Sequence, residues 1–381
     1  MTPAQREALA AYERLGSIRA VAREQGKHHK SVGDLLKRAQ AAREAEHQMD
    51  PGIKAAMSEV GLSDPLALSH AWIKTQDPET GRGVSAFVKV KPPEIEPEDM
   101  AEALSEALET HRGACPEIRA PDHVDEDLAT FYPRTDLHIG QMSWEPETGQ
   151  NWDLRRATEE IGDAASQLVG CAPPSHTAII AGMGDHYHAD DQSNRTPTSG
   201  HALDVDGRYY KVLTAGAWLD IAMIKLALQK HQHVEYNVMR GNHDPHAADA
   251  LRLAVSMFFD NHPRVTIHQC PADRWYFKWG RNLIGTAHGH RLKIRDAASV
   301  MLSEQRREMA DVDWMVFYLG HLHHREELYQ HAVMARRLGA PPAQDAYAAG
   351  GPWAPDRLME SFTYHKTRGE IARQSHFMEA S

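Results

Sequence analysis

Cysteine is scarce in this chain of 381 residues. The three cysteines, Cys115, Cys171 and Cys270, lie far apart, and none belongs to a CxxC pair. This spacing does not indicate a disulfide framework or a zinc ribbon. We therefore expect the protein to work in a reducing cytoplasm.

Long apolar runs and an excess of basic charge are also missing. Without a run of about 18 uncharged apolar residues, we expect no membrane span, and the N-terminal segment lacks the apolar core of a secretory signal. The net charge of −11 argues against a protein that coats nucleic acid through a broadly basic surface, although it allows a local basic patch. The length allows one large domain with one or two smaller ones.

Histidine, in contrast, is abundant, with 25 in the chain. The segment LGHLHHRE, residues 319–326, places three of them directly after an apolar run: His321, His323 and His324. Residues two apart on a strand face the same side, and a buried imidazole needs a partner. Alone, such a motif is most often a polar turn, so a metal site depends on ligands from other segments. His324 is expected to be solvated or to support the ligands.

Residues 1–46 are predicted to form three short helices. The spacing of Ala22, Gly26, Val32 and Leu35 is typical of a helix-turn-helix, whose third helix enters the DNA major groove. A three-helix bundle that assembles copies of the chain is the alternative. If the segment binds DNA, the expected contacts are Lys27, His28, His29, Lys30, Lys37 and Arg38.

Residues 47–129 are predicted to connect this segment to the main domain. Two apolar runs within 66–91 flank a polar turn, which indicates a β-hairpin. The stretch 94–128 is acidic and opens with prolines, so we expect an exposed helix or spacer.

From residue 130 to 381, strand-like runs alternate with amphipathic helices near 153–169 and 208–231. This alternation predicts an α/β domain. The segments SFTYHK and EIARQSHF are expected to be closing strands of its second sheet.

Five strand-like runs of this domain end just before Asp, His or Asn. The segments that follow them are Asp136-Leu137-His138, Asp185, Asn242-His243-Asp244, His288-Gly289-His290 and His321-Leu322-His323. Loops at strand ends converge in α/β folds, so we expect these side chains to share one site. Carboxylate with imidazole suits manganese, iron or zinc better than calcium.

These blocks, D-x-H, G-D, G-N-H-D, H and G-H-x-H in this order, resemble the calcineurin-like metallophosphoesterase superfamily over residues 130–330. The resemblance implies a four-layer α/β/β/α sandwich with two divalent metal ions. It implies that one ion is held by Asp136, His138 and His323, the other by Asn242, His288 and His321, with Asp185 between them. Either His288 or His290 fits the fourth block, and His288 is preferred because it lies nearer the strand end.

The resemblance also implies a reaction. A hydroxide that bridges the two ions, expected to be Mn²⁺ with iron or zinc as alternatives, attacks phosphorus in line with the leaving oxygen. His243 protonates that oxygen, and Asp244 orients His243.

The substrate is predicted from two features. His188 follows Asp185 in a G-D-x-x-H element that resembles the double-strand-break repair nucleases, where this histidine lies near the scissile phosphate. The whole layout resembles phage or prophage metallophosphoesterases with a leading DNA-binding segment. Both favour a phosphodiesterase or nuclease acting on DNA or another nucleic acid. A small-molecule or cyclic-nucleotide phosphoesterase that uses its N-terminal helices for homo-oligomer assembly is the alternative, and a non-catalytic DNA-binding protein is the third.

Four further residues are expected to contact phosphate. Residues 188–210 form a long polar insertion, interpreted as a lid or substrate platform with Asn194 and Arg195 as contacts. Arg336 and Arg337 are the other two, since arginine suits phosphate. Two adjacent surface arginines are, however, more often merely solvated.

Overall fold

The computed structural model describes most of the chain, in two compact units, Met1–Ser105 and Glu106–Ser381. The described residues are 3–47, 70–76, 83–89, 112–197, 199–352 and 356–378.

The first unit begins with three helices, as the sequence predicted. They are α1 (Pro3–Leu15), α2 (Ile18–Gln25) and α3 (His29–His47). Gly16 and Gly26 separate them in the left-handed conformation, with φ of 65° and 64°, which glycine adopts without steric cost. Buried aliphatic side chains from all three helices pack together: Ala8, Leu9, Ala11, Val21, Ala22, Val32, Leu36 and Ala39. Whether this bundle binds DNA or assembles copies stays a prediction.

The hairpin of the first unit is confirmed. Strands β1 (His70–Gln76) and β2 (Gly83–Lys89) pair antiparallel over their full lengths. The polar turn between them, and the acidic segment up to residue 111, lie outside the described residues.

The second unit contains two β-sheets. The six-stranded sheet has the order β13-β12-β3-β4-β5-β6, and the five-stranded sheet has the order β10-β11-β9-β8-β7. The strands of the first are β3 (Asp125–Arg134), β4 (Ser175–Met183), β5 (His233–Met239), β6 (Val265–Ile267), β12 (Leu358–His365) and β13 (Gly369–Phe377). Those of the second are β7 (Arg274–Trp279), β8 (Asn282–Ala287), β9 (Trp314–Leu319), β10 (Glu326–Gln330) and β11 (Val333–Arg337).

Two expectations about these strands need correction. The first strand begins at Asp125, before the expected domain start at residue 130. The two C-terminal strands, β12 and β13, were expected in the second sheet, but β12 pairs antiparallel with β3 and so extends the sheet that contains the first strand. Strand pairing of this kind joins segments far apart in sequence, which local patterns do not specify.

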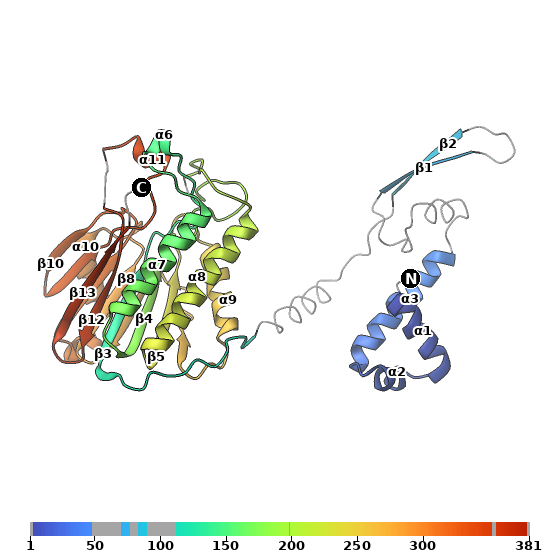
Figure 1. Ribbon diagram of the computed structural model, residues 1–381, viewed down its shortest axis with the longest axis horizontal. Helices are drawn as coiled ribbons and strands as arrows, with labels where there is room; N and C mark the ends of the chain where they lie inside the picture. The colour runs from blue at the N-terminus through green and yellow to red at the C-terminus, as the bar shows by residue number, and fades with distance from the viewer. Residues whose placement is uncertain are drawn as a thin grey trace. The chain divides into compact units, whose positions relative to one another are not determined.

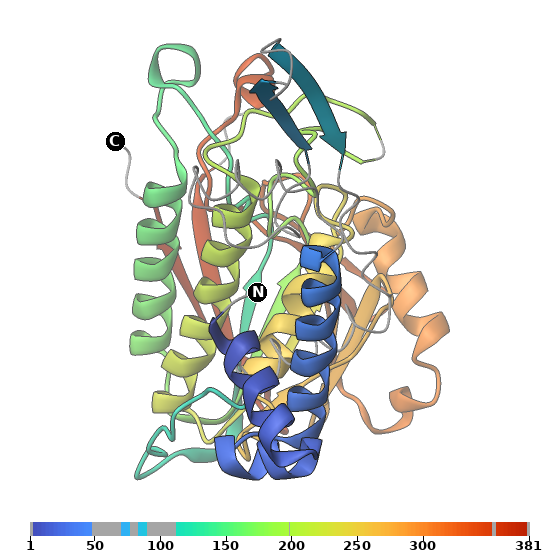
Figure 2. The ribbon, with the colours of Figure 1, turned by 90° about the vertical axis from the view of Figure 1, so that its right-hand side faces the viewer.

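Helices cover the outer faces of both sheets. The helices that do so are α7 (Leu154–Cys171), α8 (Tyr209–Lys230) and α9 (Ala247–Phe258) on the six-stranded sheet and α10 (Ile294–Glu304) on the five-stranded sheet. The short helices α6 (Glu145–Thr148) and α11 (Ala346–Ala349) contact each other, and η2 (Glu308–Asp311) is a 3₁₀ turn. Figure 1 shows α7, α8 and α9 side by side over the six-stranded sheet. Figure 2 shows α7 (green) and α10 (orange) on opposite sides of the two sheets.

The core follows from the two-residue period of the strands. Phe131 faces the other sheet, whereas its neighbour Tyr132 faces the helices. On β9, Tyr318 likewise faces the other sheet and Phe317 faces α10. Three apolar layers therefore separate helices, sheet, sheet and helix, which is an α/β/β/α arrangement.

Helix α8 has, among the described helices, the length and apolar composition to cross a membrane. It packs against α7, α9 and β5, and Ile221, Ile224 and Leu228 are buried in the core of this unit. Its fully buried Asp220 lies 2.7 Å from the guanidinium of Arg134 on β3. One face of α8 therefore belongs to the core of this unit, whereas Tyr210 and Trp218 are exposed.

Candidate metal centre

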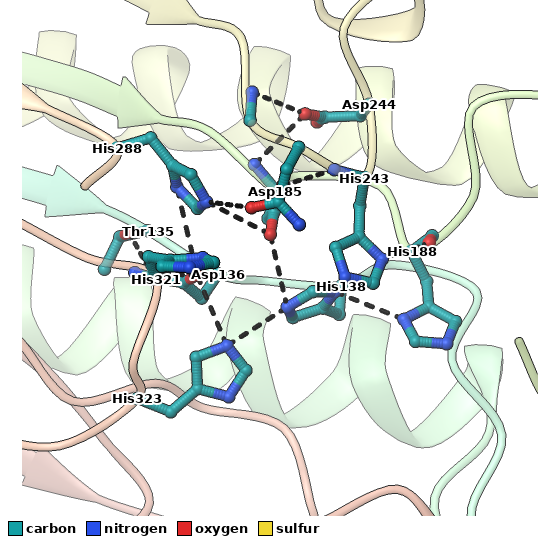
Figure 3. A network of polar contacts seen from close by, with 12 residues as sticks. Thr135, Asp136, His138, Asp185, His188, His243, Asp244, His288, His321 and His323 are labelled. Atoms are coloured by element: carbon teal, nitrogen blue, oxygen red, sulfur yellow. Dashed lines mark hydrogen bonds and ion pairs between the residues drawn. The ribbon is translucent and has the colours of Figure 1, made fainter. Parts of the chain in front are cut away.

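Loops at the carboxyl ends of β3, β4, β5, β8 and β9 bring the expected side chains together (Figure 3). Five of these residues have a positive φ that is uncommon for residues other than glycine: Asp136 (54°), His138 (43°), Asp185 (51°), His321 (73°) and His323 (55°). Such conformations are strained by on the order of 1–3 kcal/mol each and cluster at functional sites. The backbone is therefore bent to aim these side chains at one region.

Asp136, His138 and His323 form the first ligand group. The Nε2 atoms of the two imidazoles lie 3.2 Å apart, and His323 Nε2 lies 3.3 Å from Asp136 Oδ1. Ligand atoms about 2.1 Å from one ion, at angles of about 90–109°, lie roughly 3.0–3.4 Å from each other. The two separations match the edges of such a coordination sphere.

Asp185, His288 and His321 form a second group, and Asn242 lies beside it. His288 Nε2 is 3.2 Å from Asp185 Oδ2 and 3.0 Å from Asn242 Oδ1. The Nδ1–H of His288 donates to the carbonyl of Met183, so Nε2 is the nitrogen that faces the other ligands. These are again the separations of a coordination sphere.

Asp185 connects the two groups. Its Oδ2 atom is 3.2 Å from His288 Nε2 in the second group and 3.9 Å from His138 Nε2 in the first. Buried carboxylates with neutral imidazoles form a donor set that suits divalent transition metals. The residues present therefore fit two divalent cations that share Asp185.

Burial keeps several of these imidazoles unprotonated. It lowers the pKa of His188 to about 3 and the pKa of His321 to about 4, and it also holds the pKa of His138 well below its usual value. Neutral imidazoles have the lone pair that metal binding requires.

His288 differs from them. Burial opposes its protonation, but the nearby carboxylates, Asp185 first, raise the pKa of His288 to about 9. The Nε2 proton then lies between His288 and Asp185, in the region that a cation would take. Its neighbour His290, the alternative ligand, has its ring centre 5.2 Å from that of His288 and lies outside the ligand group found among the described residues.

His243 and Asp244 are placed differently from expectation. The Nδ1–H of His243 donates to the carbonyl of His188, at 2.8 Å. The carboxylate of Asp244 accepts the backbone N–H groups of Asp185, Tyr187 and Gly241. The prediction that Asp244 orients His243 is therefore wrong in this form: a main-chain carbonyl orients the imidazole, and Asp244 joins the two ligand loops. Burial, together with the Asp185 carboxylate, raises the pKa of Asp244 to about 7.

Three further residues contribute to the site: Thr135, which was not predicted, and the glycines that open the G-N-H-D and G-H-x-H motifs. Thr135 donates a hydrogen bond to Asp136, at 2.5 Å. A Cβ at Gly241 would lie 1.9 Å from Asp185 Oδ1, and one at Gly320 would lie 1.9 Å from Thr135 Oγ1. The glycines that precede Asn242 and His321 in their motifs were a signal for this, because close backbone approach needs glycine.

The residues expected to contact substrate near Asp185 differ in burial and in their partners. His188, expected near the phosphate, is only 1% exposed, and its Nδ1 contacts His138. Asn194 has a φ of 53°, and Arg195 donates to the carbonyl of Gly200 within the same loop. That Asn194 and Arg195 contact phosphate stays a prediction.

The two other arginines are engaged in ion pairs. Arg336 pairs with Glu327 and Glu370 and is mostly buried. Arg337 pairs with Glu326, and its Nη1 lies 3.3 Å from His324 Nε2. Their guanidinium groups are thus already neutralised by carboxylates, and a role in phosphate binding stays a prediction.

The expected DNA contacts lie at the start of α3 and on its surface. Lys27, His28, His29, Lys30 and Lys37 are exposed. The side chain of Arg38 lies outside the described residues. His324, beside the candidate ligand His323, is exposed, and its Nδ1–H donates to the carbonyl of Leu322.

No family model and no curated protein matches this sequence. Similar solved structures include a protein of Streptococcus pneumoniae TIGR4 described as a predicted phosphoesterase (11% identity, 66% of this chain and 99% of that chain, TM-score 0.28). Another is an archaeal phosphodiesterase (13% identity, 66% of this chain and 99% of that chain, TM-score 0.29). A third is a dimetal phosphatase of Danio rerio (8% identity, 67% of this chain and 100% of that chain, TM-score 0.34). These neighbours are of the metallophosphoesterase type, but at such TM-scores the likeness is too weak to transfer any of their properties to this chain.

Proposed function

We propose that residues 106–381 form a phosphoesterase that depends on two divalent metal ions and hydrolyses phosphodiesters. The observation that carries this proposal is the set of donor separations between 3.0 and 3.3 Å in the two ligand groups, with Asp185 reaching both. Buried carboxylates and imidazoles need partners of opposite character, and two shared cations would supply such a partner to both groups at once.

The expected roles follow from the donor atoms. Asp136, His138 and His323 would hold one ion, Asn242, His288 and His321 the other, and Asp185 both. When bound, two such ions would polarise a phosphoryl group and lower the pKa of an attacking water.

His243 supplies the proton in this proposal. Because its Nδ1–H is held by the carbonyl of His188, its Nε2 is the nitrogen left for proton transfer to the leaving oxygen. Its backbone N–H donates to Asp185 Oδ1, at 2.8 Å, which fixes the loop beside the bridging carboxylate. Asp244 acts by holding the loops of Asp185 and Gly241 together.

The test compares metal content with hydrolysis of a chromogenic diester. Removal of metal, verified by elemental analysis, is expected to abolish hydrolysis, and Mn²⁺ is expected to restore it. Asp185→Asn should lower hydrolysis by at least about 10²-fold, more than the loss typical of a residue that only supports a ligand. Asp163→Asn, on the exposed surface of α7, is the matched control. Hydrolysis at the untreated rate by fully metal-free protein would rule out the proposal.

For the substrate, we propose DNA or another nucleic acid. Supporting this choice are the exposed Lys27, Lys30 and Lys37 on and beside α3, together with the resemblance of the G-D-x-x-H element. For duplex DNA, the slope of log K against log salt should decrease by about 0.9 for every phosphate that the protein no longer neutralises. Substituting all three lysines by alanine in the full chain should therefore weaken DNA binding and flatten its salt dependence, without changing hydrolysis of a small diester.

Arg155→Ala, which removes one exposed cation from α7, is the control for general charge effects. Identical isotherms for the triple variant and the wild type would exclude this DNA-binding surface.

A small-molecule phosphoesterase is the second candidate. The net charge of −11 favours it, since an acidic protein repels nucleic acid except at a local basic patch. This candidate predicts that deletion of residues 1–46 leaves DNA affinity unchanged and gives a smaller particle by light scattering. Turnover of cyclic nucleotides or other small diesters should then exceed turnover of oligonucleotides.

A further inference from the structure

The side chain of His188 makes one contact that the proposed reaction does not use. Its Nδ1 lies 3.2 Å from Nδ1 of His138, and the two rings meet edge to face with centres 5.2 Å apart (Figure 3). Both histidines are buried, with 1% and 3% of their surface exposed. This contact joins a candidate metal ligand to a residue outside the two groups that contain carboxylates. His138, His188 and His243 also lie close enough to hold an ion, but this third group contains imidazoles alone.

The direction of this hydrogen bond follows from the other side of His138. Its Nε2 faces His323 and Asp185, so a cation there needs the Nε2 lone pair. The proton of neutral His138 must then lie on Nδ1, and an imidazole N–H in a buried site needs an acceptor. The nitrogen in reach is Nδ1 of His188. His188 must therefore accept at Nδ1 and hold its own proton on Nε2, which is buried and has no hydrogen-bond partner among the described residues.

The main chain of His188 has a separate task. Its N–H donates to the carbonyl of Ile139, and its carbonyl accepts from Nδ1 of His243. Substitution of the side chain therefore leaves the groups that hold His243 in place. The ring of His188 also stacks on that of His243, with centres 5.3 Å apart, so a substitution changes this packing contact together with the contact to His138. Metal affinity and tautomer, rather than turnover, are therefore the readouts that report on His138.

We propose that His188 is a positioning residue for His138: it fixes the Nδ1–H tautomer and the ring plane that aim Nε2 at the first cation. The inference rests on the proposed function for the presence of that cation. His188 itself touches neither substrate nor metal in this role.

The test uses two substitutions in the full-length protein. In His188→Asn, the amide oxygen takes the approximate place of Nδ1 and can accept the same proton. In His188→Leu, the volume is largely kept and the acceptor is removed. Removing the partner of a metal-bound imidazole typically weakens metal binding by about 10–100-fold. In His188→Leu, we expect such a weakening in one of the two Co²⁺-binding steps. In His188→Asn, we expect an affinity near that of the wild type. Chelator competition and visible absorption measure both.

His186→Asn is the matched control. His186 is also buried and lies in the same loop, but it faces Asp220, at 3.8 Å, rather than the ligands. This variant should keep wild-type Co²⁺ affinity even if its unfolding temperature falls. An equal loss of affinity in His186→Asn would overturn the proposal, because any disturbance of the loop would then have the same effect.

A second readout is independent of affinity and of activity. Long-range proton–nitrogen spectra of the Zn²⁺-loaded protein with labelled histidine report the tautomer of each ring. The proposal requires a protonated Nδ1 in His138 and a protonated Nε2 in His188. The reverse assignment would overturn it.

The two proposals fail in different ways. A wild type that binds two cations without hydrolysing any phosphoester would refute the proposed function and leave the role of His188 intact. Equal Co²⁺ affinity in wild type and His188→Leu would refute the role of His188 and leave the proposed hydrolysis untouched.

Discussion

Buried histidines have different surroundings at the two ends of the same parallel strands. At the amino end of β4 and β5, the fully buried His231 has a protein partner for each nitrogen: the Tyr132 hydroxyl at 2.9 Å from Nε2, and the Ser175 hydroxyl at 2.8 Å from Nδ1. At the carboxyl end, the Nε2 atoms of His138 and His323 face each other at 3.2 Å. In the first arrangement hydroxyl groups face both nitrogens, whereas in the second two imidazole nitrogens face each other beside the carboxylate of Asp136.

The backbone conformation also differs between the two ends of the strands. Around the metal centre, Asp136, Asp185 and His321 have a positive φ, whereas His231 ends α8 with an extended backbone at φ −119°. Strain is stored where side chains must converge and is absent where they only need to pack. The contrast shows that burial of histidine alone does not indicate a metal site. At the carboxyl ends of the strands, buried imidazoles also face buried carboxylates on loops with positive φ.

Removal of His243 should have the largest effect. His243→Ala is expected to lower turnover by about 10²–10⁴-fold, the usual contribution of a general acid, with metal content near that of the wild type. The loss should shrink for diesters whose leaving group needs no proton. His231→Gln, at the opposite end, should keep wild-type turnover.

Elemental analysis decides between this role and an alternative one. If His243→Ala loses metal in proportion to activity, His243 is a ligand, and the carboxyl end holds one more ligand than the two groups described above. A wild-type rate would remove His243 from the mechanism.

The stability of the folded protein in acid should distinguish the buried His231 from a solvated histidine. Burial lowers the pKa of His231 to about 4 in the folded protein, whereas an unfolded histidine has a pKa of about 6.5. Between these values the unfolded chain binds more protons, so stability present above pH 6.5 is lost as the pH falls toward 4. The loss from this one group is roughly 3 kcal/mol.

Urea unfolding of wild type and His231→Gln in the same buffers measures this contribution, because the effects of acid on the metal ligands are common to both. The difference in stability between the two proteins should change between about pH 7 and about pH 4. A constant difference would show that His231 titrates normally.

Metal should stabilise the folded protein only through the ligand groups at the carboxyl ends of the parallel strands. Mn²⁺ at about 100 times its dissociation constant should raise the free energy of unfolding by about 2.7 kcal/mol for one ion. The gain should vanish in Asp185→Asn and persist in His231→Gln. Equal gains in both variants would mean that the ion binds elsewhere.

Ser175→Ala should have the smallest effect of the four. It removes the hydroxyl that bonds both His231 and Thr130, each at 2.8 Å. A buried hydrogen bond contributes about 1 kcal/mol, so a loss of that order in the free energy of unfolding is expected with no change in metal content or turnover. A loss of turnover would mean that the two ends are coupled.

Local sequence predicted much of this molecule. The amphipathic pattern near 153–169 predicted α7, because a helix repeats every 3.6 residues, and the face that it buries includes Leu154, Ala157 and Ile161. The expected ligands do gather in space, since the loops after parallel strands meet at one edge of a sheet. The sheet that β12 and β13 join was not predictable in this way, because its pairing with β3 spans most of the second unit.

By itself, the sequence determined which residue types stand at the strand ends and which helical and strand periods surround them. Only the tertiary structure decided which atom of each side chain faces the centre. The Nδ1–H of His288 is held by Met183, that of His243 by the carbonyl of His188, and the carboxylate of Asp244 is taken up by backbone N–H groups. These partners come from different loops, and a hydrogen bond depends on distance and angle in space, which spacing along the chain does not specify.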